Sequence, residues 1–153
     1  MDKNIYSLVT KFRKAVECAR NEGALEENQI LSRFPNGCCG IISSLLAKYL
    51  SDNGIYSYEV SGTFRNDNHE ETQSHAWLML EDNTIIDITG DQFKNNPIFL
   101  YYSEKVYVGP MNKFHELFED VEKFPYEDFT EGTSKINIQN KKNYEIILSY
   151  IQN

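Results

Sequence analysis

The stretch GCCGIISSLLAKYLSDNG, residues 37–54, decides the fold of this chain. Its apolar side chains recur at spacings of three and four, which is the period of an amphipathic α-helix. These side chains are Ile41, Ile42, Leu45, Leu46, Tyr49 and Leu50. Turn-forming residues precede the helix at 34–37 and close it at 52–54. We therefore predict a helix over residues 39–51, with Cys38 or Cys39 at its start.

A second amphipathic pattern lies upstream, at residues 4–22. Its apolar positions are Ile5, Leu8, Val9, Phe12, Val16 and Ala19, with lysine and arginine on the other face. This pattern predicts a helix that stops near Gly23. Cys18 lies beside small apolar residues in it, and we interpret Cys18 as a packing residue. Residues 25–31 should add a short helical turn before the Pro35 break.

The chain downstream of residue 54 is typical of β-structure. Short apolar or alternating runs, bounded by Gly, Asn and Asp, predict strands at 56–64, 76–80, 84–88 and 105–108. The polar segment 65–74 should be a loop, and 81–83 a tight hairpin turn. A short helix is expected within 109–122 and a loop at 125–134, while 143–151 fits a closing helix or a strand. Helices followed by an antiparallel meander indicate one α+β domain over residues 1–153.

Composition narrows the function classes. The chain has 153 residues, with 15 Lys+Arg against 23 Asp+Glu, so its net charge is −8. Nucleic acid and anionic membranes are disfavoured as partners, because both are bound through basic surfaces and no Lys/Arg cluster here exceeds a pair. No apolar run approaches the roughly 20 residues of a membrane span, and the N-terminus lacks a secretory leader pattern. We expect a cytoplasmic protein.

Cysteine usage supports a reducing compartment. Three cysteines is an odd number, and Cys38 and Cys39 are adjacent, so a disulfide framework is disfavoured. No Cys-x2-Cys pair is present and the histidines are widely spaced, which disfavours structural zinc. We predict no metal and no cofactor. His69, beside two glutamates, suggests a metal corner, but a solvated loop is the preferred interpretation.

The order of three residues carries the chemistry. Cys39 lies at a helix start, His75 in SHAWL (74–78) at the head of a strand, and Asp87 in IIDIT (85–89). A helix N-terminus stabilises a thiolate, a neighbouring histidine can take the thiol proton, and a carboxylate behind the histidine fixes its tautomer. With a turn near residues 82 and 83, paired positions sum to about 165. This register leaves Asp87 offset from His75 by a few residues, and a bulge or a longer loop would bring it within reach.

At this point the sequence resembles the transglutaminase-like branch of the papain-fold cysteine enzymes. The resemblance covers residues 34–92 and is carried by GCCG (37–40), Leu45-Leu46, Gly54-Ile55, VSG (60–62), SHAW (74–77) and IDIT (86–89). It implies a papain-like fold, with helices packed on an antiparallel sheet, and a Cys–His–Asp triad. The family's spacing from the nucleophile to the Gly-Ile pair favours Cys39, with Cys38 as the alternative.

The resulting functional prediction is a cysteine-dependent acyl-transfer enzyme. Catalytic roles go to Cys39, His75 and Asp87, and a thiol hydrolase (peptidase or amidase) ranks first. A transglutaminase, an acyltransferase or a protein-deamidating toxin would use the same triad, and a non-catalytic protein-binding module on this fold is the alternative from another class. The expected substrate is a protein or peptide. The sequence leaves the oligomeric state open.

Several neighbouring residues need an interpretation. The backbone N–H of Cys39 is one natural oxyanion donor. The other oxyanion or cleft candidates are Asn36, Cys38 and Gln92. Trp77 alternates with apolar residues in a strand and is predicted to lie in the core. His115 could replace His75 as the base, but a surface helix is the preferred interpretation.

Overall fold

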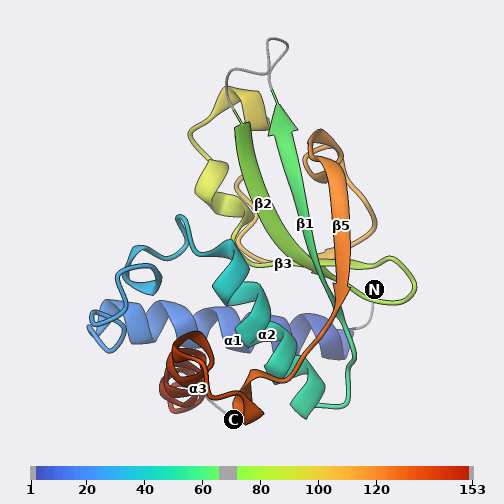
Figure 1. Cartoon of the computed structure of the whole chain (residues 1–153). Helices are drawn as coiled ribbons and strands as arrows, with labels where there is room; N and C mark the ends of the chain where they lie inside the picture. The colour runs from blue at the N-terminus through green and yellow to red at the C-terminus, as the bar shows by residue number, and fades with distance from the viewer. Residues whose placement is uncertain (1–2, 66–71, 152–153) are drawn as a thin grey trace.

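The computed structural model describes residues 3–65 and 72–151 (Figure 1). Within them the α-helices are α1 (Lys3–Asn21), α2 (Cys39–Asp52) and α3 (Lys135–Leu148). The strands are β1 (Tyr58–Arg65), β2 (Thr72–Met79), β3 (Ile85–Asp87), β4 (Tyr107–Gly109) and β5 (Glu119–Pro125). Short 3-10 turns are η1 (Leu31–Arg33), η2 (Gly90–Phe93), η3 (Pro97–Phe99), η4 (His115–Leu117) and η5 (Phe129–Glu131). The α+β class predicted from the sequence is confirmed.

The strands form one antiparallel sheet in the order β4-β3-β2-β1-β5. The first four strands make the predicted meander. The β2–β3 turn also falls as expected, because Leu80 N–H bonds to Thr84 O and Asn83 takes a left-handed φ of 70°. The paired positions sum to 164, close to the predicted value, as in Leu78 with Ile86.

Strand β5 was missed, because residues 109–122 were expected to hold a helix. Every residue of β5 is exposed, so its sequence has no buried alternation from which a strand could be recognised. It pairs with β1 at the edge of the sheet opposite β4. The 109–122 segment instead contains only the single 3-10 turn η4 before β5.

Two apolar clusters form because successive strand residues face opposite sides of the sheet. The main core takes side chains from all three helices and from one sheet face, including Leu78, Ile86 and Val108. The second cluster, here called the aromatic cluster, is Val60, Trp77, Ile85, Phe93, Phe99, Phe114 and Phe118. The prediction that Trp77 is a core residue is confirmed, since it is 1% exposed.

The helices pack together, and α2 lies against β1 and β2 (Figure 1). The two N-terminal helices agree with their predicted ranges to within a residue, and the closing segment is helical but begins earlier, at Lys135. Cys18 was interpreted wrongly: it is exposed, whereas its neighbours Ala15, Val16 and Ala19 are buried. None of the described helices combines the length and apolar character needed to cross a membrane.

Candidate active site

Cys39 is the first residue of α2, so its side chain lies where the helix presents unpaired backbone N–H groups. The side chain is partly exposed. The next residue, Gly40, is exposed, and a side chain built there would meet nothing within 4 Å. The residue after the cysteine therefore adds no side chain that could cover this end of the helix. Cys38, the alternative nucleophile, is 1% exposed and belongs to the main core.

The N-terminus of α2 meets β2 where the β2–β3 ladder has ended. That ladder contains only the pairs of Leu78 and Met79, so β2 has no β3 partner at Ala76 and His75. The His75 ring and the Ala76 backbone both lower the pKa of the Cys39 thiol through hydrogen bonding, which places them beside the sulfur. Because β3 is short, β2 has no β3 partner at the place where Cys39 approaches His75.

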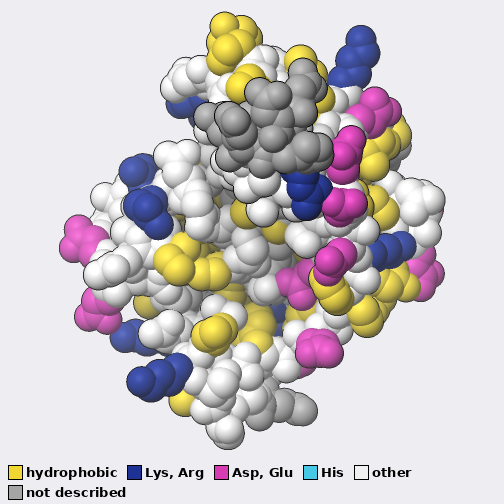
Figure 2. Space-filling view, turned by 45° about the horizontal axis from the view of Figure 1, so that its top comes forward, with side chains coloured by type: hydrophobic (Ala, Val, Ile, Leu, Met, Phe, Trp, Pro, Cys, Tyr) yellow, Lys and Arg dark blue, Asp and Glu magenta, His cyan; other side chains and the backbone are white. Residues whose placement is uncertain are grey.

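His75 is fully buried on β2, opposite Gly62 of β1. A Cβ at Gly62 would lie 2.8 Å from the Phe118 side chain, so glycine lets the aromatic cluster close over this position. The His75 ring contacts four aromatic side chains at centroid distances of 5.3–5.6 Å, namely Trp77, Phe93, Phe114 and Phe118. On the face shown in Figure 2, no described histidine reaches the surface.

Asp87, at the end of β3, holds the second nitrogen of His75. His75 Nε2 lies 2.7 Å from Asp87 Oδ2, and the carboxylate is 2% exposed. The other carboxylate oxygen, Oδ1, accepts the Thr89 backbone N–H at 3.0 Å. The structure thus brings together the three residues that the sequence singled out, in the order Cys39, His75, Asp87.

Their charges are coupled. Burial raises the pKa of the Cys39 thiol, but hydrogen bonding and the charge of His75 outweigh it, so the net pKa is lowered. Burial lowers the pKa of His75, yet Asp87 and Cys39 raise it to about 9. Burial likewise opposes ionisation of Asp87, and the two histidines hold its pKa well below its usual range. These directions favour a thiolate–imidazolium pair. Burial raises the pKa of Cys38 to about 12, which keeps that thiol protonated.

Gln92 of η2 also reaches the site. Its Nε2 donates to Thr89 O at 3.0 Å and lies 3.4 Å from His75 Nδ1. This places a side-chain amide beside the histidine nitrogen that is not bound to Asp87. The Asn36 side chain, by contrast, is exposed in the loop before α2. Its role as an oxyanion donor stays a prediction.

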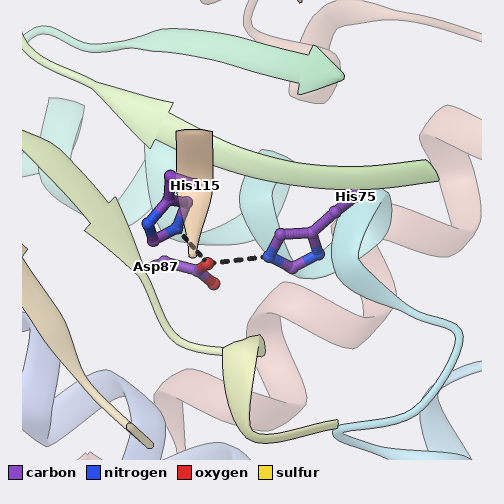
Figure 3. Close-up of side chains that lie close together, drawn as sticks. All are labelled: His75, Asp87 and His115. Carbon is purple, nitrogen blue, oxygen red and sulfur yellow. Dashed lines mark hydrogen bonds and ion pairs between the residues drawn. The ribbon is translucent and has the colours of Figure 1, made fainter. Parts of the chain in front are cut away.

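His115 was interpreted wrongly as a surface residue. It is 1% exposed, and its Nε2 lies 2.8 Å from the same Asp87 oxygen that His75 contacts. Figure 3 shows the two rings approaching this oxygen from two sides. The sequence signal lay in Asn112 and in the flanking Phe114 and Phe118, which fold η4 back over the sheet. His69 lies outside the described residues.

The group His75, Asp87 and His115 has the composition of a metal site. One ligand atom from each lies within 4.8 Å of the others, and two imidazoles with a carboxylate can bind zinc or iron. The hydrogen bonds of 2.7 and 2.8 Å to Asp87, however, already pair these atoms with one another. The arrangement is therefore accounted for without an ion.

Comparison of the chain with protein-family models, with curated proteins and with solved structures finds no match.

Proposed function

We propose that this protein is a cysteine-dependent acyl-transfer enzyme with a papain-like, transglutaminase-like architecture. The activity that we rank first is that of a thiol hydrolase, which cleaves an amide bond in a protein or peptide. One observation carries the proposal. A partly exposed cysteine at a helix N-terminus has its thiol pKa lowered by a fully buried histidine, and that histidine is held by a buried carboxylate at 2.7 Å. A binding module would have no need to keep a nucleophile and a base in contact.

Each residue has a defined task in this reaction. The Cys39 thiolate attacks the carbonyl carbon, and the new C–S bond forms as the carbonyl electrons move onto oxygen. The Cys39 backbone N–H, with Gln92 as the side-chain candidate, would donate to that oxyanion. The His75 imidazolium gives its proton to the leaving amine, and an acyl thioester remains on Cys39. Asp87 orients the ring and stabilises its charge throughout.

The second half-reaction decides the product. A water molecule, deprotonated by His75, attacks the thioester carbonyl, which releases the acid and restores the thiolate. The partial exposure of Cys39 gives water access to the thioester, so hydrolysis is ranked above transfer to an amine. The same triad would also perform transamidation or deamidation with another acceptor or substrate.

Site-resolved alkylation tests the proposal. The protein is treated with iodoacetamide at pH 6, and the modification of each cysteine is followed by mass spectrometry. Cys39 should react at least about tenfold faster than exposed Cys18, because an ordinary thiol is almost fully protonated at this pH. Cys18 and buried Cys38 act as internal references.

The His75→Ala variant should bring the rate of Cys39 down to that of Cys18. Equal rates in the wild type, with no effect of His75→Ala, would remove the catalytic interpretation. A peptide-library digest comparing wild type with Cys39→Ala then identifies the substrate and distinguishes hydrolysis from transfer.

A further inference from the structure

The inference concerns His115, the buried histidine that the triad does not use. Its two ring nitrogens both face oxygen atoms. Nε2 lies 2.8 Å from Asp87 Oδ2, and Nδ1 lies 2.8 Å from Asn112 Oδ1. A neutral imidazole has one N–H donor and one bare nitrogen, so it can satisfy only one of these oxygens.

The orientation of the Asn112 amide is fixed by a second bond. The backbone N–H of His115 donates to Asn112 Oδ1 at 2.8 Å, and Asn112 Nδ2 faces the Tyr102 hydroxyl at 3.5 Å. Turning the amide over would place its NH₂ group against that backbone N–H. The oxygen therefore stays toward the ring.

Only some of the remaining neighbours of His115 can gain or lose a proton. Its ring lies 5.8 Å from that of Tyr102, 5.7 Å from Tyr107 of β4 and 6.2 Å from His75 of β2, with Trp77 at 5.0 Å. Burial raises the pKa of Tyr102 strongly, so this phenol stays neutral. Asp87 is thus the anion that faces His115, and the His75–Cys39 pair lies beyond it.

We propose that His115 carries protons on both ring nitrogens and is a positioning residue, which holds Asp87 Oδ2 in place and shares its negative charge with His75. This role rests on the proposed function, since it acts on the Cys39–His75 pair. Two N–H groups then fix one carboxylate oxygen. The positive ring of His115 also partly offsets the charge that Asp87 presents to His75.

The consequence is a limit on how firmly His75 holds its proton. His75 must give its proton to the leaving group, and an imidazolium held too tightly by Asp87 is a weak acid. A second positive ring 6.2 Å away opposes that excess stabilisation. His115 thus sets the pH range in which the Cys39–His75 pair exists, while Asn112 sets the protonation of His115.

The test measures the Cys39 alkylation rate from pH 4 to pH 10, with ring-nitrogen NMR of the histidines. In the wild type, His115 should show two protonated nitrogens at pH 7. In His115→Gln the amide can still donate to Asp87 but brings no charge, and the Asp87 charge raises the pKa of the Cys39 thiol. The acid limb of the alkylation profile should therefore move up by about 1–2 pH units. Asn112→Ala keeps the ring and removes its second acceptor, and it should shift the limb in the same direction.

Tyr102→Phe is the matched control. It removes the hydroxyl near Asn112 and keeps the ring stacked on Phe114 at 4.0 Å, so the profile should stay in place. A structural role alone would lower stability without moving the limb. One bare His115 nitrogen in the wild type, as a bound metal would also require, overturns the proposal. The NMR measurement reports on His115 even if Cys39 proves unreactive. Failure of the proposed function can therefore be distinguished from failure of the proposal for His115.

Discussion

Within residues 3–65 and 72–151 the protein buries two ionic groups, and the groups differ in whether they can exchange a proton near neutral pH. On the helix side of the sheet, Arg13 of α1 forms a two-pronged bridge to Asp91 at 2.8 and 3.0 Å and donates to Ile88 O at 2.6 Å. In the aromatic cluster, Asp87 receives two histidines. A guanidinium keeps its charge at any ordinary pH, whereas an imidazole gains and loses its proton near neutrality.

This difference suggests separate roles for the two groups, one in stability and one in reactivity. Arg13 ties α1 to the η2 segment that carries Gln92, and its guanidinium lies 4.6 Å above the Phe34 ring in the loop before α2. It therefore joins the two chain segments that deliver Gln92 and Cys39. The Asp87 group, by contrast, is linked through His75 to Cys39, where a proton can be exchanged with a substrate. The first group should govern stability and the second should govern reactivity.

The largest expected effect is on the Arg13 bridge. Asp91→Ala leaves a buried guanidinium without its main partner and should lower the free energy of unfolding by about 3–5 kcal/mol. Urea denaturation measures this. Glu17→Ala is the control, because Glu17 also pairs with Arg13 but its side chain is 35% exposed, and it should cost about 1 kcal/mol or less. Equal costs for the two variants would contradict the role given to Asp91.

The corresponding change in the other group should act on reactivity. Asp87→Asn removes the charge that stabilises the His75 imidazolium, so Cys39 should be alkylated about 10- to 100-fold more slowly at pH 6. Cys18 reports on general reactivity in the same sample. The loss of stability should be smaller than that of Asp91→Ala. An unchanged Cys39 rate would break the assignment of Asp87.

These two groups also show what the sequence could and could not predict. Helical periodicity located α1 and α2, and turn residues located the β2–β3 hairpin, because both signals are local. The juxtaposition of His75 and Asp87 followed from the strand register. His115 could not be placed, because its burial depends on a loop folding back from beyond β4. Arg13 was likewise read as part of a charged helix face, since its partner is 78 residues away.

The pH dependence of stability should distinguish the groups further. The pKa of His75 is raised to about 9, so the stability from its imidazolium is fully present below about pH 6.5 and is lost as the pH rises through about 9. Cys39→Ala removes the coupled thiol titration, and Asp87 still raises the pKa of His75 there. In that background the free energy of unfolding should fall by about 1–2 kcal/mol between pH 6 and pH 9.5. Adding His75→Gln should flatten the dependence, and a fall that persists would assign it to another group.

The smallest expected effect concerns the adjacent cysteines, of which only Cys38 belongs to the main core. Cys38 packs in the main core, which also contains residues of α1, while Cys39 lies beside His75. Cys38→Ala removes one buried sulfur and should cost about 1 kcal/mol of unfolding free energy, measured by urea denaturation. The Cys39 alkylation profile should keep its position, because the Cys38 thiol stays protonated and adds no charge. A shifted profile would mean that Cys38 affects the reactivity of Cys39, and the main core could then no longer be assigned to stability alone.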